Sequence, residues 1–147
     1  MQPLTATGAR RWCDAQGLAA GRRGFPEPRS TPSDFRIPSD AGKRVALVNR
    51  HLYLFEGAAE ILVWFDDWAV WPSGQRMHVF ERVLASYGHR APLIEQPAFL
   101  FSAAEYDDAV SFVTIGVLFL WDVHVVDAGG QHLVFYSHDE LGWTAGL

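Results

Sequence analysis

A segment near the C-terminus, WDVHVVDAGGQHLVFYSHDE, is dense in side chains that can exchange protons, bind metal ions or meet charged partners. These side chains flank a Gly-Gly pair and comprise Asp122, His124, His132, Tyr136, His138, Asp139 and Glu140. Histidine titrates near neutral pH and is a frequent general base and metal ligand. The segment could therefore be an acid–base site, a metal site, or the polar side of an ordinary β-hairpin.

Alternating apolar and polar residues on both sides of the Gly-Gly pair predict two antiparallel strands. A three-residue loop, 128–130, would place Asp122 opposite Tyr136. The apolar face would then comprise Trp121, Val123, Val125, Leu133 and Phe135, which we expect to pack on a helix. The outward face would comprise Asp122, His124, Val126, His132, Val134, Tyr136 and His138. A two-residue loop would shift the pairing by one and bury histidine or aspartate, so we expect the three-residue loop.

A metal site in this hairpin would use its three histidines with one of two aspartates. The candidate ligands are His124, His132 and His138 with Asp122 or Asp139. Alternate residues of a strand share a face, so the grouping is possible, but His124 and His132 lie diagonally. No zinc motif such as H-E-x-x-H is present. We therefore expect neither a metal nor a cofactor.

Acid–base chemistry is the other reading of the SHDE motif at 137–140. His138 would act as the base, and Asp139 or Glu140 would orient it. Ser137 and His138 are neighbours along a strand and point to opposite faces, so we expect no serine–histidine dyad. A strand-end turn capped by Asp139 accounts for the same residues without catalysis.

A second group of candidates is Asp66-Asp67, which follows an apolar run and precedes Trp68 and Trp71. Paired carboxylates beside tryptophans could serve glycoside chemistry, with the indole rings stacking on a sugar. The same residues are also an ordinary way for a chain to leave a sheet. The sequence leaves both interpretations open.

Composition limits the protein class. The chain has 147 residues, 49% of them hydrophobic, which is typical of one globular domain. Cys13 is the only cysteine, so neither an intrachain disulfide nor a cysteine zinc cluster can form. No signal peptide is evident, and no apolar run reaches the roughly 20 residues that span a bilayer. We expect a cytoplasmic protein that does not bind membranes.

Charge is divided unevenly along the chain. Residues 1–50 hold nine lysines and arginines against four acids, a formal charge of +5. Residues 51–147 hold three arginines against thirteen acids, a formal charge of −10. The acidic part disfavours nucleic acid as a ligand and favours a basic protein partner. Alternatively, the basic segment folds back on the acidic part, or the acids serve only solubility.

The expected fold is a single α+β domain, with about four helices packed on a small, mostly antiparallel sheet that ends in the C-terminal β-hairpin. Residues 1–40 would form a basic helix and a Pro/Gly-rich arm, and residues 41–147 an acidic globular body. The predicted elements are helices over Ala6–Gln16, Ala41–Phe55, Ser73–Tyr87 and from a Ser102–Glu105 capping box to Leu120, with strands over Ile61–Phe65 and 98–101 before the hairpin. The order of residues 17–40 stays open.

The stretch DDWAVWPSGQRMHVFERVLASYG, together with FYSHDE, resembles a group of small, mostly uncharacterised bacterial proteins. They share a tryptophan-rich strand, W-P-S before a helix and a near-terminal SHDE. The resemblance brings no catalytic residues. In general character the chain is also similar to bacterial toxin-immunity proteins, which are single-domain, cytosolic and acidic.

The sequence therefore predicts a protein-binding module, most concretely a cytosolic bacterial immunity protein that occludes a cationic toxin. The predicted surface comprises Asp66, Asp67, Trp68, Trp71, Asp122, His124, Tyr136, His138, Asp139 and Glu140, with Trp143 as a further anchor. The alternative is a small hydrolase or metal-dependent enzyme that uses the His138/Asp139 and Asp66/Asp67 groups. We expect a monomer or homodimer.

Overall fold

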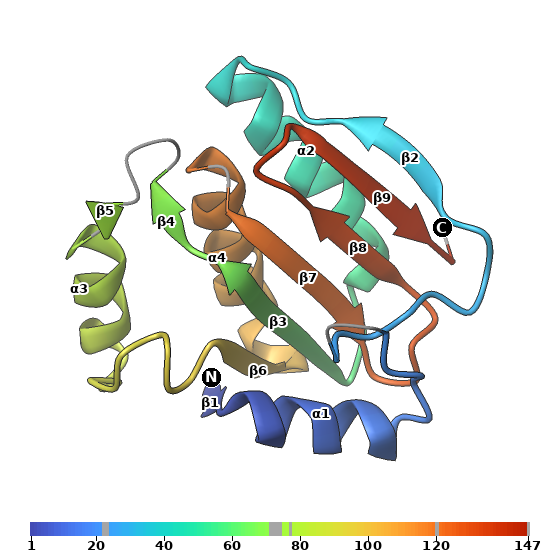
Figure 1. Cartoon of the computed structure of the whole chain (residues 1–147), viewed down its shortest axis with the longest axis horizontal. Coiled ribbons are helices and arrows are strands. Elements are labelled where there is room, and N and C mark those ends of the chain that lie inside the picture. Colours follow the sequence, from blue (N-terminus) through green and yellow to red (C-terminus); the bar gives the residue numbers. More distant parts are fainter. Residues whose placement is uncertain (22–23, 71–74, 77, 120, 147) are drawn as a thin grey trace.

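The computed structural model describes residues 1–21, 24–70, 75–76, 78–119 and 121–146. Its main feature is a seven-stranded sheet in the order β1-β6-β3-β7-β8-β9-β2, in which every neighbouring pair is antiparallel. Helices pack on both faces of this sheet (Figure 1). The predicted α+β class, with a C-terminal hairpin, is confirmed.

The sheet joins strands from both ends of the chain. Its members are β1 (Gln2–Leu4), β2 (Ser33–Arg36), β3 (Glu60–Asp67), β6 (Ala98–Ser102), β7 (Asp122–Asp127), β8 (Leu133–Tyr136) and β9 (Leu141–Ala145). A separate ribbon pairs β4 (Ala69–Val70) with β5 (Gln75–Arg76). The edge strands β1 and β2 come from the first forty residues, so the N-terminal segment belongs to the same sheet as the rest. The sequence did not predict β1, β2 or β9, which have at most five residues each.

Local signals place the start of the first, second and fourth helices correctly, but the third helix begins at His78 and not at Ser73, because Gln75–Arg76 forms strand β5. They are α1 (Ala6–Ala15), α2 (Ala41–Leu52) continued by η1 (Tyr53–Phe55), α3 (His78–Ser86), and η2 (Ala103–Glu105) leading into α4 (Tyr106–Leu118). The Asp40 carboxylate accepts a hydrogen bond from Lys43 N at 2.8 Å, and Ser102 and Glu105 form the predicted capping box. The proposed cap of the third helix, Ser73, lies outside the described residues. None of the described helices is long and apolar enough to cross a membrane.

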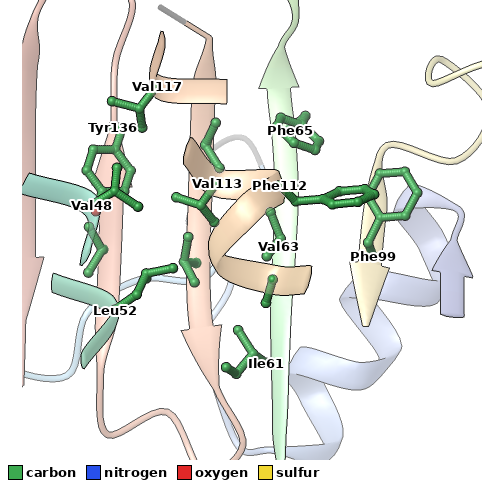
Figure 2. Packing of buried hydrophobic residues seen from close by; sticks show 14 of the residues in the cluster. Val48, Leu52, Ile61, Val63, Phe65, Phe99, Phe112, Val113, Val117 and Tyr136 are labelled. Carbon is green, nitrogen blue, oxygen red and sulfur yellow. The ribbon is translucent and has the colours of Figure 1, made fainter. Parts of the chain in front are cut away.

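The first face of the sheet is covered by α2 and α4 (Figure 2). Phe112 of α4 packs on Phe99 of β6, with ring centroids 5.4 Å apart. Where α4 crosses β7 the approach is close, because a Cβ added at Gly116 would lie 2.7 Å from Cγ2 of Val123. These contacts belong to a core in which Phe99, Phe112 and Val113 are almost wholly buried.

The second face is covered by α1 and by the described part of the arm, residues 17–21 and 24–32. Ala9 and Cys13 of α1 pack over Leu62 and Trp64 of β3. The arm folds back on itself through a bridge between Ala20 and Pro26. The described residues of the arm are therefore part of the fold.

The hairpin has a different register from the predicted one. Val123 pairs with Tyr136, and His124 pairs with Phe135, which is a shift of one residue and leaves four residues, 128–131, in the loop. Tyr136 therefore joins the first face, while Phe135 turns to the second. The prediction assumed that one face meets water and must be polar. That assumption was wrong because α1 and the arm cover the second face.

Candidate binding surface

The second face carries a row of aromatic rings because four neighbouring strands are in register there. Trp64 of β3 is opposite His124 of β7. His124 is in turn opposite Phe135 of β8, which is opposite Trp143 of β9. Side chains directly opposite each other in antiparallel strands are in reach of one another. Ring centroids are accordingly 4.4 Å apart for His124 and Phe135, and 5.8 Å apart for Phe135 and Trp143.

Phe25 of the arm adds a ring to this row from outside the sheet. It stacks on His124 with centroids 4.3 Å apart and planes inclined by 10°, and its centroid lies 4.6 Å from that of Trp64. The imidazole of His124 is thus held between two phenyl rings, and the residue is only 8% exposed. Its predicted outward position was wrong because the arm covers it.

Beside the row, the arm and the sheet enclose a hollow of about 560 Å³. Its apolar lining comprises Phe25, Pro26, Pro28, Pro32, Phe135 and Trp143. Proline fixes the backbone torsion φ, so the arm forms a stiff wall without needing a helix or strand. Coverage of the second face is incomplete at this point.

A second hollow, of about 310 Å³, adjoins the first through Phe135 and Trp143. Leu141, which is 49% exposed, borders this second hollow. We call the two hollows together the aromatic groove. An open apolar groove of this kind is a common site for a protein or peptide partner.

Carboxylates surround the apolar floor of the aromatic groove. Glu27 and Asp66 line the first hollow, and Asp34 and Asp139 line the second. Within the described chain, no lysine or arginine is among the residues that line either hollow. The groove therefore combines aromatic surface with negative charge.

His138 is held by Asp122, where the sequence suggested Asp139 or Glu140. Oδ1 of Asp122 accepts hydrogen bonds from the backbone N–H and from Nδ1 of His138, at 2.7 and 2.9 Å. Asp139 is farther away, with 3.6 Å between its Oδ1 and Nε2 of His138. Burial alone would lower the pKa of His138, but the hydrogen bond and charge of Asp122, with the charges of Asp139 and Asp67, raise it overall. Asp122 itself is buried, so its predicted outward position was wrong.

Glu140 is engaged by Arg44, a buried arginine of α2. Nη2 of Arg44 lies 3.3 Å from Oε1 of Glu140. The same guanidinium donates to the carbonyl oxygens of Pro38 and Leu118, at 2.6 and 3.1 Å. Glu140 has a φ of 58°, in the left-handed region, at the turn between β8 and β9. Its carboxylate ties this turn to the helices and so has a structural role.

Tyr136 lies fully buried on the first face, so its predicted outward position was also wrong. Its hydroxyl is 3.1 Å from Nδ1 of His51 on α2. Burial, assisted by the charge of Arg50, lowers the pKa of His51 to about 4, and burial raises the pKa of Tyr136. Both groups are therefore neutral near pH 7, and they form a hydrogen bond in the core.

The Asp66-Asp67 pair lies at the end of β3, as predicted, and its members face different surroundings. Asp66 lines the aromatic groove, whereas Asp67 is exposed and in register with Asp122 beyond an irregularity in the strand. Trp68 is partly buried against the core of the first face. Trp71 lies outside the described residues.

The three candidate histidines of the hairpin have separate environments. His124 lies in the aromatic row, His138 binds Asp122, and Nδ1 of His132 lies 2.9 Å from Oδ2 of Asp127 at the other end of the strands. Among the described residues, no group of three or more histidine, cysteine, aspartate or glutamate side chains could hold a metal ion. Each of these imidazoles has a structural contact of its own.

Sequence reasoning missed Glu27 and Asp34 and placed Phe135 on the wrong face. The signal for Phe25 was present, since an aromatic residue in a proline-rich arm indicates a contact with the body. Comparison of the chain with protein-family models, with curated proteins and with solved structures finds no match. The functional argument therefore depends on the fold and on the chemistry of the aromatic groove.

Proposed function

We propose that this domain is a protein-binding module, most concretely a cytosolic bacterial immunity protein that neutralises a cationic toxin by occlusion. One observation carries the proposal: the aromatic groove joins exposed apolar surface to carboxylates, with no lysine or arginine among its described lining residues. Binding energy at protein interfaces concentrates in aromatic anchors, a role that Phe135 and Trp143 would take. The carboxylates would steer and orient a basic partner.

The charge of the rest of the chain supports the same kind of partner. Residues 51–147 carry thirteen acids against three arginines. Such a surface repels the phosphates of nucleic acids and attracts basic proteins. Occlusion requires no catalytic group in this chain, only a surface that matches the toxin in shape and charge.

The test uses the product of the adjacent gene as the partner. We expect that product to arrest cell growth alone, and co-expression of this protein to restore growth. Calorimetric titration of the two purified proteins should give an affinity that falls as salt rises, because exposed charges are screened. A toxin that this protein does not neutralise, or an affinity indifferent to salt, would contradict the proposal.

Variants connect that test to the aromatic groove. Trp143→Ala should weaken the complex by more than about tenfold, as expected for an interface anchor. Tyr53→Ala is the matched control, because Tyr53 is an exposed aromatic residue outside the groove. An equal loss of affinity in the two variants would show that the partner binds elsewhere on the protein.

The Asp122–His138 pair supports a second candidate function, a small hydrolase or metal-dependent enzyme. A buried aspartate that binds Nδ1 fixes the tautomer of an imidazole and prepares Nε2 to act as a base. Asp139 and the Asp66-Asp67 pair would supply further acidic groups. A panel of fluorogenic esters, phosphodiesters and glycosides tests this, first alone and then with added divalent metals.

The histidine variants decide this second test. Turnover should be lost in His138→Gln at unchanged melting temperature. His132→Gln, which alters the other Asp–His pair, is the control and should keep activity. No turnover across the panel, or turnover that survives His138→Gln, would overturn the enzyme reading.

A further inference from the structure

Two carboxylates of the aromatic groove, Glu27 and Asp34, have no ionic or hydrogen-bonding side-chain partner within the described chain. Both residues are exposed, Glu27 on the arm and Asp34 on the edge strand β2. Arg36 follows on the same strand, but it is in register with Leu141 at the strand end and is not among the residues that line the second hollow. The negative charge of Glu27 and Asp34 is therefore available to a cation from outside.

The floor beside these carboxylates consists of partly exposed aromatic side chains. Trp143 is in register with Phe135 on one side and with Asp34 on the other, so ring and carboxylate are neighbours across the strands. The rings of Phe135 and Trp143 are inclined by 38°. The faces of aromatic rings carry negative partial charge and attract cations, most strongly for tryptophan. Carboxylates and ring faces together favour a cation that also has a flat apolar surface.

We infer that the aromatic groove takes an arginine side chain of the partner, with its guanidinium over Phe135 and Trp143 and in reach of Glu27 or Asp34. This inference rests on the proposed function, because it names the group by which the partner is held. A guanidinium is planar and weakly hydrated and stacks on aromatic rings, whereas an ammonium is compact and strongly hydrated. The first hollow, at about 560 Å³, is large enough for such a side chain.

The experiment uses L-argininamide and the purified protein, followed by NMR at the indole N–H of Trp143. The signal is assigned by its loss in Trp143→Phe. L-citrullinamide is the matched control ligand, because its side chain has nearly the same shape and no charge. L-lysinamide tests the ammonium. We expect saturable millimolar binding of L-argininamide, several-fold weaker binding of L-lysinamide, and no saturation with L-citrullinamide.

Variants of the protein test the two parts of the site separately. Trp143→Leu should weaken L-argininamide binding by about tenfold, the scale of a good cation–π contact. Glu27→Gln and Asp34→Asn should together weaken it by about two- to fivefold, as expected for exposed ion pairs. Tyr53→Leu and Glu95→Gln change an exposed aromatic residue and an exposed acid outside the groove and should have no effect. If Trp143→Leu does not fold, the carboxylate variants decide alone.

Binding of L-citrullinamide as tight as that of L-argininamide, or shifts confined to residues outside the groove, would overturn the inference. Its failure is distinguishable from failure of the proposed function, since no partner protein takes part. Argininamide binding without neutralisation of any toxin would support the groove as a guanidinium site and overturn the immunity role. Neutralisation without argininamide binding would support the immunity role and overturn the groove as a guanidinium site.

Discussion

The two faces of the sheet are covered in different ways, and the coverings leave different amounts of room. On the first face α2 and α4 close the core, and Phe99 and Val113 have no exposed surface. On the second face α1 and the arm leave Phe135 and Trp143 partly exposed at the aromatic groove. A helix supplies a continuous stripe of side chains to a sheet, whereas a proline-rich arm supplies only a few.

The polar groups follow the same division. His51 and Tyr136 on the first face are kept neutral by burial and bind each other. His138 on the second face is partly open to water, and the hydrogen bond and charge of the buried Asp122 raise its pKa against the effect of burial. The first face therefore contributes stability, and the second contributes a surface on which charge and aromatic area coexist.

The largest expected effect comes from a matched pair of phenylalanine truncations, one on each face of the sheet. Phe112→Ala on the first face should lower the free energy of unfolding by about 3–5 kcal/mol, because it leaves a closed cavity. Phe135→Ala on the second face should cost about 1–2 kcal/mol, because water already reaches that ring. Urea unfolding measures both, and equal losses would show that the second face is as closed as the first.

The next effect is a loss of stability as the pH falls below 6.5. Because the pKa of His51 is lowered to about 4, the unfolded chain binds a proton between that value and 6.5 while the native protein does not. Stability should therefore fall as pH falls through this window, by about 3 kcal/mol in total. Replacing His51 by Gln should remove this part of the pH dependence. A histidine signal that titrates near 6.5 in the native protein and belongs to His51 would contradict the burial argument.

Two glycine substitutions should change the stability of the native state in opposite directions. Gly116→Ala puts a Cβ 2.7 Å from Val123 and 3.0 Å from Phe65, so it should destabilise the native state by about 1–3 kcal/mol despite alanine's better helix propensity. Gly8→Ala in α1 meets only ordinary contacts of 3.4 Å or more and should stabilise by about 0.5–1 kcal/mol. Thermal unfolding measures both shifts. A stabilising Gly116→Ala would mean that α4 sits less tightly than described.

The smallest effect belongs to His138 on the second face. Its raised pKa means that protonation favours the folded state, so this contribution is complete below pH 6.5 and is lost as pH rises through the folded pKa. NMR titration should give a midpoint above 6.5, and Asp122→Asn should lower it. A midpoint at or below 6.5 in the native protein would show that Asp122 does not hold the imidazolium.

The local elements could be predicted because their signals lie within a few residues of one another. The Ser102–Glu105 box starts the last helical segment, as the sequence indicated, and the side chain of Asp40 caps α2. Gly57 and Gly88 occupy left-handed conformations with φ of 86° and 81°, close after helices that were expected to end there. Such features depend on short-range hydrogen bonds and backbone torsions, which the neighbouring residues set by themselves.

Only the tertiary structure decided the hairpin register and the composition of the groove. In a strand, the side that a residue faces changes with every single step, and the choice depends on what covers each face. Both coverings come from distant parts of the chain, so Tyr136 was assigned to water and Phe135 to the helices. The groove brings Phe25, Asp34 and Trp143 together across more than a hundred residues of sequence. That proximity is created when the arm closes over the sheet, and no local pattern encodes it.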